Sequence, residues 1–323
     1  MPQTSPSPPI TTEKAPRVSV GLVVFNGENY IDQAIRSIRA QTFEDFELII
    51  SDNGSTDGTR EICEFHANED PRIRYLRSEV NRGVAWNMNN VINQARAPYF
   101  KLACHDDEIS PTFLERCIEI LDAQPDVVCA YTYTINKRRL SNRKSYVIRK
   151  YLLDDEPASS RVEERFRYLI GRQYWVSPVF GVIRHPLLAR AGQFRDMHSA
   201  DVALLIHLGM YGRFHQVPEF LFIRRFHNEQ VSELLKGDAK TYYASWNTAK
   251  KRTFGLPLWK FLGVQISAIL RPPLTIAERL RCTRVLFNWV GEKRGQLLKE
   301  LLSIPAQRKG KTDAQGKILG ESK

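Results

Sequence analysis

A short acidic segment, Asp106–Glu108, closely follows an apolar run, Tyr99–Cys104. The run predicts a strand that is buried on both faces, and the Ser110–Pro111 pair predicts that a helix starts just beyond it. Acids at the carboxyl end of such a strand lie where open α/β sheets bind ligands. Their hard oxygen atoms suit Mg²⁺ or Mn²⁺ together with substrate phosphates. An acidic turn that caps the next helix is the simpler interpretation of this segment alone, so the rest of the chain has to decide.

The elements that must position these acids alternate between strands and helices along the first half of the chain. This alternation predicts right-handed βαβ units and a doubly wound, mostly parallel α/β sheet flanked by helices. The loops that follow the strands then meet at one edge of the sheet. The predicted strands are 17–25, 46–51, 73–76, 99–104 and 127–131 in this part, and 217–223 further along.

The loops at that edge exclude two common nucleotide sites. No GxGxxG motif follows the first strand, where Asn26–Gly27–Glu28–Asn29 stands, and no GxxxxGK[ST] motif occurs. The edge instead offers an acid, Asp52, that can accept a hydrogen bond from a base or a ribose, and a cation, Arg82. With an acidic segment available for a metal, this set predicts a nucleoside diphosphate whose charge is neutralised mainly by a divalent ion.

The composition fits the same class of ligand. The 323 residues carry a net charge of +11, which calls for an anionic partner such as nucleotide phosphates, nucleic acid or an anionic membrane. The five cysteines show no CxxC pairing, and this pattern is typical of reduced thiols in a cytoplasmic protein. No stretch approaches the ~20 apolar residues of a membrane span.

The run from Val18 to about Ser232 resembles the family-two glycosyltransferases, which are inverting, metal-dependent enzymes with the GT-A fold. The resemblance rests on Phe25–Asn26, Ser51–Thr59, Asn81–Gly83 and the acidic segment in the place of the family's DxD metal motif. It implies a UDP-, dTDP- or GDP-sugar donor, a saccharide or lipid-linked acceptor, and Mg²⁺ or Mn²⁺. It implies no binding of nucleic acid.

The resemblance also implies roles for single residues. Asp52 would contact the nucleotide base, and Asp106 would hold the metal that bridges the two phosphates. Cys104 replaces the first acid of DxD, so Asp107 or a neutral His105 would have to compensate. The implied nucleotide-binding residues are Phe25, Asn26, Glu28, Asp52, Arg82, Asp106 and Arg225, and the implied metal ligands are Asp106, Asp107 and His227.

Asp201 is the candidate catalytic base, because an inverting transfer needs a group that takes the proton from the acceptor hydroxyl. Its position at the start of an apolar helix also fits a simple helix cap. Members of the family place their base in an acid at the start of this helix, and Ala200 stands where a second acid is usual, so the resemblance favours Asp201. By the same resemblance Arg225 would neutralise the diphosphate and His227 would complete the metal site, within an Arg-x-His segment.

The chain divides into four parts by composition and by resemblance. A basic connection around 137–144 is expected to be a solvated loop, and 175–183 is expected to be a strand. The Trp-bearing basic helices near the C-terminus fit equally well a pair packed on the core and a contact with the inner face of a membrane. The parts are a disordered leader (1–16), a GT-A catalytic domain (17–235, nucleotide-binding half 17–107 and acceptor half 108–235), a helical appendage (236–305) and a disordered basic tail (306–323).

Two other functions remain open at this point. A GT-A-like nucleotidyltransferase would normally carry a glycine- and lysine-bearing phosphate loop after the first strand, and this chain has none. A catalytically degenerate sugar-nucleotide-binding or scaffold protein is favoured by Cys104 and opposed by Asp201.

Overall fold

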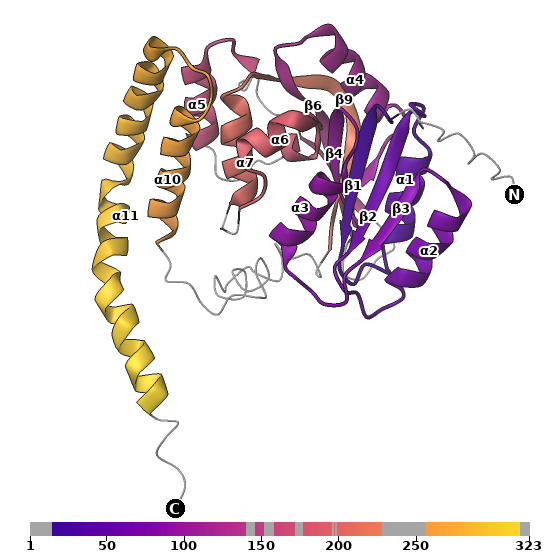
Figure 1. Cartoon of the computed structure of the whole chain (residues 1–323), viewed down its shortest axis with the longest axis horizontal. Coiled ribbons are helices and arrows are strands. Elements are labelled where there is room, and N and C mark those ends of the chain that lie inside the picture. The colour runs from indigo at the N-terminus through magenta and orange to yellow at the C-terminus, as the bar shows by residue number, and fades with distance from the viewer. Residues whose placement is uncertain are drawn as a thin grey trace, which may run out of the picture.

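The computed structural model describes residues 15–139, 146–151, 158–171, 177–195, 197, 199–227 and 256–316. A nine-stranded mixed sheet runs through the centre, and helices cover both of its faces (Figure 1). The strand order is β3-β2-β1-β4-β8-β6-β9-β5, and β7 pairs with β6 outside this path.

The first half of the sheet is parallel, as the alternating pattern predicts. Neighbouring strands β3, β2, β1 and β4 all run in the same direction, and every residue of β1 and β2 is buried. Burial on both faces explains why these strands read as continuous apolar runs. Their bounds are β1 Val18–Val24, β2 Phe46–Asp52, β3 Ile73–Arg77 and β4 Tyr99–Cys104, with connecting helices α1 Ile31–Arg39, α2 Thr59–Glu69 and α3 Val84–Gln94.

The second half of the sheet is mixed. Strand β8 pairs antiparallel with both β4 and β6, while β9 runs parallel to β6 and antiparallel to β5. The strands are β5 Glu108–Ile109, β6 Val127–Arg139, β7 Tyr146–Tyr151, β8 Val182–Arg184 and β9 Arg213–Phe226, and the helices are α4 Phe113–Ala123, α5 Val162–Gly171, α6 His185–Ala191 and α7 Ala200–Gly209.

Local predictions fail in two places in this half. The strand predicted over 175–183 is wrong over Ser177–Phe180, which form a 3₁₀ turn, and only Val182–Arg184 pair in the sheet. Pro178 explains part of the difference, because proline has no N–H to donate to a strand neighbour. The solvated loop predicted from Lys137 is also wrong at its start, since 137–139 are the last residues of β6 and pair with β7. The rest of that predicted loop, 140–144, lies outside the described residues.

Two hydrophobic cores lie on the two faces of the sheet. The smaller one lies under α1, α2 and α4, and the larger one lies under α3, α5, α6, α7 and the C-terminal helices. Strand β4 contributes to both, because successive side chains of a strand point to opposite faces: Phe100 and Leu102 join the larger core, and Tyr99 and Ala103 the smaller one. Cys104 packs against the larger core, so it points to the α7 side of the sheet.

Two long helices, α10 (Pro257–Leu270) and α11 (Ile276–Gly316), close the described chain at the end of the molecule remote from α2 (Figure 1). Pro272–Pro273 separate them, as the sequence predicts. Helix α11 continues to Gly316, so the predicted disordered tail is wrong over 306–316. This stretch contains Ala, Gln, Lys and Arg, which are good helix formers. Residues 1–14 of the predicted leader, 236–255 of the predicted appendage and 317–323 of the predicted tail lie outside the described residues.

Candidate active site

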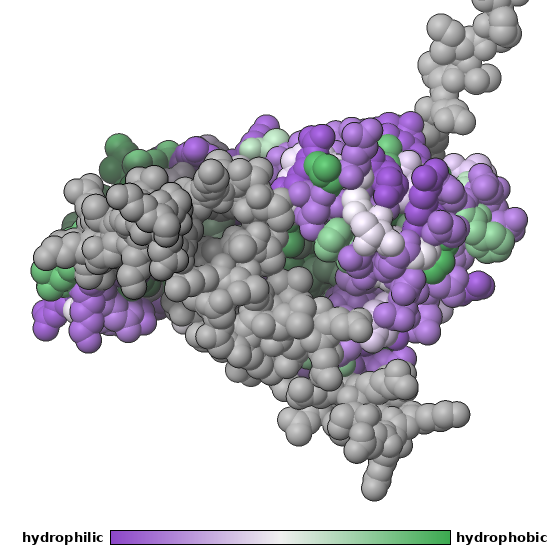
Figure 2. Space-filling model, turned by 90° about the horizontal axis from the view of Figure 1, so that it is seen from below, coloured by the Kyte–Doolittle hydropathy of each residue, from purple (hydrophilic) through white to green (hydrophobic). Residues whose placement is uncertain are grey.

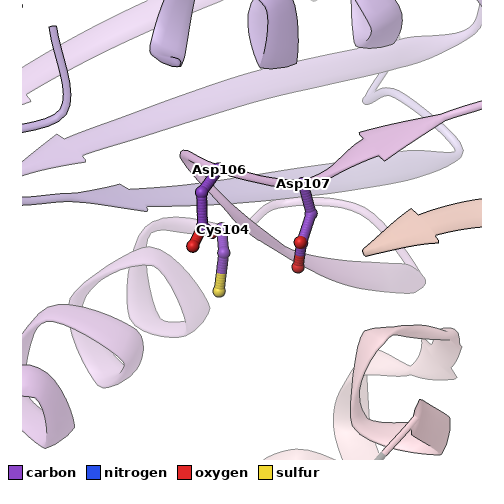
Figure 3. A group of neighbouring side chains, drawn as sticks. All are labelled: Cys104, Asp106 and Asp107. Atoms are coloured by element: carbon purple, nitrogen blue, oxygen red, sulfur yellow. The ribbon is translucent and has the colours of Figure 1, made fainter. Parts of the chain in front are cut away.

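The acidic segment forms a compact cluster at the carboxyl end of β4. One ligand atom from each of Cys104, Asp106 and Asp107 lies within 4.8 Å of the other two. Figure 3 shows the three side chains pointing to the same side of the loop between β4 and β5. His105 is not part of this cluster; its ring lies so close to Gly27 that a Cβ there would be 2.6 Å from a ring carbon. The structure therefore groups Cys104 with the two acids and turns His105 toward the loop after β1.

Burial sets the electrostatics of the cluster. Asp106 and Asp107 are only 8% and 9% exposed. Burial, and then the neighbouring charge of Asp106, raises the pKa of Asp107 above its ordinary value. Burial also raises the pKa of the Cys104 thiol, so the thiol is neutral near pH 7. Two buried carboxylates that repel each other are a suitable place for a divalent cation, so the donor set fits Mg²⁺ or Mn²⁺ through its two acids.

A buried lysine lies beneath the cluster. Lys101 is almost fully buried, and its amine donates a hydrogen bond to the carbonyl of Leu102 at 2.9 Å. The amine also lies 5.0 Å from the ring centroid of Phe113 and 5.6 Å from that of Phe222. Burial lowers the pKa of Lys101 to about 8, although the charge of Asp107 opposes this shift. Lys101 thus supplies part of the positive charge that a pair of buried acids requires.

Arg225, in β9, and His227, directly after β9, both contact the cluster. His227 Nε2 lies 3.1 Å from Asp106 Oδ2, and the His227 ring packs on Tyr30 with 4.4 Å between centroids. The backbone N–H of Arg225 donates to Asp107 Oδ1 at 3.0 Å, and its Nε donates to the carbonyl of Asp106 at 3.1 Å. Both residues therefore touch the acids, although they stand 118 to 121 residues further along the chain, and the role of His227 as a metal ligand stays a prediction.

The Arg225 guanidinium is committed to the protein itself. It donates to Gln33 Oε1 of α1 at 2.6 Å and pairs with Glu108 of β5. It also lies over the ring of Tyr30, with Cζ 4.9 Å from the centroid. These contacts join β9, α1 and the acidic loop, so Arg225 holds the cluster in shape. Direct neutralisation of a diphosphate by Arg225 stays a prediction.

Arg224 is the cation that the sequence analysis missed. Strand alternation places it on the face of β9 opposite Arg225, and Arg225 faces α1. Burial raises the pKa values of Cys104 and Asp107, and the positive charge of Arg224 opposes this rise. Arg224 therefore lies within electrostatic range of the cluster. Its Cζ lies 5.1 Å from the ring centroid of Phe226. The sequence predicts this strand only over 217–223, so alternation could not assign the two arginines to faces.

The loops after β1 and β2 are joined to each other. Asn26, at φ +51°, accepts a hydrogen bond from the backbone N–H of Thr56 at 2.9 Å. The Glu28 carboxylate accepts one from the backbone N–H of Gly58 at 2.8 Å, at the start of α2. Phe25 beside them is exposed at the same edge. The structure thus brings Phe25, Asn26 and Glu28 to the predicted edge, and it gives Asn26 and Glu28 a part in building that edge.

Asp52 also reaches the edge, but its carboxylate is enclosed. The side chain is 0% exposed; Oδ1 accepts from the Ser55 N–H at 2.8 Å, and Oδ2 accepts from the Tyr75 hydroxyl at 2.7 Å. Arg77 adds an ion pair at 3.4 Å. Burial of Tyr75 and the hydrogen bond from its hydroxyl to Asp52 raise the pKa of Tyr75. Asp52 therefore organises the loop after β2, and its contact with a nucleotide base stays a prediction.

Arg82 presents an exposed cation at the same edge. Its backbone N–H donates to Asn53 Oδ1 at 2.9 Å, which fixes the loop before α3. Its guanidinium lies over the ring of Trp86, with Cζ 4.9 Å from the centroid. Arg82 therefore lies at the predicted edge of the sheet, and its contact with a nucleotide stays a prediction.

Asp201 lies in the first turn of α7, and its Oδ1 accepts a hydrogen bond from the backbone N–H of Val202 at 2.8 Å. Its neighbours Ala200 and Val202 are part of the larger core, on the side of the sheet to which Cys104 points. Ser199 stands at the N-cap of α7, so the prediction that Asp201 caps this helix is wrong, although its carboxylate stabilises the first turn. The role of Asp201 as a base stays a prediction. Asp196 and the segment 228–232 lie outside the described residues.

A mixed sheet of this order, with an acidic cluster at the end of β4, defines the GT-A class of glycosyltransferase folds. A structure of S. aureus TarS 1–349 in complex with UDP-GlcNAc matches this fold with a TM-score of 0.62 at 18% identity, and the match covers 88% of this chain and 79% of that one. A structure of the same protein with UDP gives a TM-score of 0.60. The model of glycosyl transferase family 2 matches residues 19–192, so this chain belongs to that family.

Two long synthases are among the relatives by sequence. Chondroitin synthase of Escherichia coli is 25% identical over 223 residues, which are 69% of this chain and 31% of the relative. Hyaluronan synthase of Pasteurella multocida is 23% identical over 223 residues, which are 68% of this chain and 21% of the relative. The chain thus spans less than a third of the length of these two relatives. Glycosyltransferase GlyG of Streptococcus pneumoniae, at 29% identity over 187 residues, matches over 57% of this chain and 60% of its own length.

Proposed function

We propose that this protein transfers a sugar, of hexose type, from a nucleotide-diphosphate sugar to an acceptor hydroxyl, with inversion at the anomeric carbon and with the help of Mg²⁺ or Mn²⁺. The observation that carries the proposal is the cluster of Cys104, Asp106 and Asp107 at the carboxyl end of β4, in a chain of glycosyl transferase family 2. Open α/β sheets bind their ligands at this edge.

In the proposed site, Asp106 and Asp107 hold the metal ion, with His227 adjacent to Asp106. The bound ion supplies positive charge that stabilises the departing diphosphate. Cys104 is a weaker ligand for such a hard cation, because its thiol is neutral and soft. Asp107 therefore takes the place of the absent first acid of the DxD motif.

Two cations share the charge of the donor diphosphate in this proposal. Arg224 reaches it from β9, on the side to which the cluster points, and Arg82 reaches it from the loop before α3. Arg225 acts as a positioning residue, because its guanidinium is already bound to Glu108 and Gln33. Charge-assisted contacts of this kind stabilise the leaving nucleoside diphosphate most when its charge develops.

Asp201 is the proposed general base. The acceptor oxygen attacks the anomeric carbon while its proton passes to the Asp201 carboxylate, and the bond to the diphosphate breaks on the opposite side. The position of Asp201 on the same face of the sheet as Cys104 supports this role. Phe25, Asn26 and Glu28 then form the wall that receives the nucleoside, and the enclosed Asp52 holds the loop after β2 in place behind it.

The proposed donors are UDP-, dTDP- or GDP-sugars, and the proposed acceptor is a saccharide or a lipid-linked saccharide. The similarity to proteins named chondroitin synthase and hyaluronan synthase supports a role in making a cell-surface polysaccharide. All five cysteines are free thiols, which supports action in the cytoplasm, at the inner face of the membrane.

A catalytically degenerate, sugar-nucleotide-binding protein is the second candidate, and Cys104 is the observation that favours it. A neutral thiol cannot replace a carboxylate as a ligand for Mg²⁺ or as an acceptor for a ribose hydroxyl. This candidate binds the donor but does not break its glycosidic bond.

A donor-hydrolysis screen separates the two candidates. The purified protein is incubated with a panel of UDP-, dTDP- and GDP-sugars, with Mn²⁺ or with a chelator, and released nucleoside diphosphate is measured. We expect metal-dependent release from one donor of the panel. Saturable binding of a donor without any release, also when free saccharides are added as acceptors, would identify the degenerate protein.

A further inference from the structure

The two C-terminal helices carry apolar residues on the side that faces away from the protein. On α10, Trp259, Ile266 and Leu270 are exposed and recur at helical spacing, with Gly263 between them. The opposite side of α10 is also apolar and is buried in the larger core. A helix that is apolar all round is normally covered on all sides. Among the described residues, the core and α11 pack on α10, and the side that carries Ile266 and Leu270 stays exposed.

The same arrangement extends along α11. Ile276, Leu280, Phe287 and Leu298 are exposed, with exposed fractions of 79% for Ile276 and 71% for Phe287. Their spacing of 4, 11 and 22 residues from Ile276 places them within about 40° of each other around a helix of 3.6 residues per turn. The residues that pack on the rest of the protein lie on the other side of α11, and they are Cys282, Val285, Leu286, Trp289 and Leu297.

The two exposed stripes lie on one surface. The Trp259 indole N–H donates to the carbonyl of Leu297 at 3.1 Å, and Arg279 donates to the carbonyl of Leu270 at 2.9 Å, so the helices run antiparallel along their length. Because both helices turn their buried stripes into the same core, their exposed stripes share the outer side of the pair. Figure 2 shows hydrophobic residues gathered at the left end of the molecule, where α10 and α11 lie in Figure 1. The outer face is Trp259, Ile266, Leu270, Ile276, Leu280, Phe287 and Leu298.

The charge around the outer face is positive. Residues 256–302 contain eight lysines and arginines against three glutamates, which gives a net charge of +5. Arg281 forms an ion pair with Glu163 of α5, at 2.9 Å. The exposed cations of the two helices and their connection include Lys260, Arg271, Arg284, Arg294 and Lys299.

We propose that the outer face of α10 and α11 binds the surface of an anionic lipid bilayer. An apolar stripe with basic residues beside it is the combination that lets a helix lie in the interface of such a membrane. A second copy of this chain would bring +5 against +5, so charge favours the lipid over a dimer. Among the described residues, no helix combines the length and the apolar character needed to cross a membrane.

This inference rests on the proposed function, because a membrane-bound enzyme would meet a lipid-linked acceptor at the surface of the bilayer. The attachment would hold the catalytic domain next to the bilayer, through the contact of α11 with α5 and of α10 with α7. Its test measures binding to lipid and does not require any sugar transfer.

The experiment is flotation of the full chain with vesicles of phosphatidylcholine alone and with vesicles that also contain phosphatidylglycerol. We expect binding to the anionic vesicles, weaker binding at high salt, and little binding to the neutral ones. The double variant Leu280→Gln/Phe287→Gln should bind more than about tenfold more weakly, because it removes two large apolar side chains from the interface. Phe65→Gln is the matched control, since Phe65 is an exposed aromatic residue of α2 at the other end of the molecule.

Three results would overturn the inference. One is failure of the parent protein to float with anionic vesicles, and another is equal flotation of the parent and the double variant. The third is a concentration-dependent dimer in sedimentation analysis that the double variant abolishes, because the outer face would then bind a second copy. Release of nucleoside diphosphate, measured on the same double variant, shows separately whether the proposed function holds.

Discussion

Asp52 and the Asp106–Asp107 pair occupy equivalent places at the carboxyl ends of parallel strands, and yet their surroundings differ. Asp52 is fully buried and shares its two oxygens among Ser55, Tyr75 and Arg77. Asp107 is also buried, but its pKa is raised by that burial and by the charge of Asp106. Asp52 already has a cation, Arg77, as its partner. Asp106 and Asp107 also have protein contacts, but they repel each other, and such a pair retains the capacity to bind a cation. Position at the edge therefore does not decide the role of an acid; its partners do.

The neighbouring arginines of β9 repeat the contrast with the opposite charge. Arg225 is bound on the α1 side by Glu108 and Gln33. Arg224 lies on the other side, in range of Cys104 and Asp107. The residues at this edge therefore form two groups, those whose contacts build the site and those proposed to contact a ligand. Mutations in each group test this assignment.

The largest effect is expected for Asp106→Ala. Loss of this carboxylate should abolish Mn²⁺-dependent binding of the nucleoside diphosphate and lower the rate of sugar transfer by about 10³-fold or more, as several kcal/mol of charge stabilisation disappear. Calorimetry of the nucleoside diphosphate with and without Mn²⁺ measures the first effect. Unchanged metal-dependent affinity in the variant would show that the metal site lies elsewhere.

Asp201→Asn should follow, with a transfer rate lower by about 10²–10⁴-fold at unchanged donor affinity. The amide has the same shape as the carboxylate and suits a helix start comparably, so the melting temperature should hardly change. A residue that only stabilises the helix predicts a near-normal rate in this variant, with a loss of about 1 kcal/mol of stability in Asp201→Ala. Transfer rate, donor affinity and melting temperature of both variants decide between the two roles.

His207, in the last turn of α7, is a titratable residue on the same helix as Asp201. Its substitution is expected to change stability and not sugar transfer, so it is a control for Asp201. It is buried beside Arg195, whose guanidinium lies 3.1 Å from Nε2, and burial followed by the Arg195 charge lowers the pKa of His207 to about 4. The imidazole of His207 binds a proton near pH 6.5 in the unfolded chain but only near pH 4 in the folded protein. The free energy of unfolding should therefore fall as the pH drops from about 6.5 toward 4, by roughly 3 kcal/mol in total. Denaturant unfolding at neutral and acidic pH measures this loss.

The control variant for that measurement is His207→Gln, which keeps an acceptor for Arg195 and removes the titration. It should show a shallower decrease of stability with falling pH and a transfer rate near that of the parent protein. An equally steep decrease in the variant would assign the acid sensitivity to other groups.

Arg224→Gln and Arg225→Gln test the division of β9. Arg224→Gln should weaken donor binding by about 10–100-fold at an unchanged melting temperature, since a charge-assisted hydrogen bond contributes about 1.5–3 kcal/mol. Arg225→Gln should lower the melting temperature, because the half-buried Glu108 then loses its closer cation and, among the described residues, keeps Lys137 at 3.5 Å. The opposite pattern, with stability lost in the first variant and donor affinity alone in the second, would reverse the assignment.

The smallest effect on binding is expected for Asp52→Asn. Its enclosed position predicts that unfolding becomes easier by about 1–3 kcal/mol, while the donor dissociation constant changes less than about tenfold. Direct contact with a nucleotide base predicts the reverse ranking, so donor titration and denaturant unfolding of one variant separate the two roles.

The sequence by itself determined the parallel half of the sheet and the family. Its apolar runs, such as Val18–Val24 and Phe46–Asp52, are buried on both faces, so their pattern depends on no distant partner. The acids after β4 were found in the same way, because a buried strand followed by Asp106 and Asp107 marks the edge of a sheet. Local signals of this kind lie within a few residues of each other.

Only the tertiary structure decided which of these edge residues are already paired. One partner of Asp52 is Tyr75, 23 residues away, and Arg225 reaches Gln33 of α1 across 192 residues. The faces of Arg224 and Arg225 followed from the register of β9 in the sheet, and the outer face of α10 and α11 followed from which of two apolar stripes is covered. Burial and hydrogen bonding over such distances depend on how the chain packs, and no local pattern of residues records them.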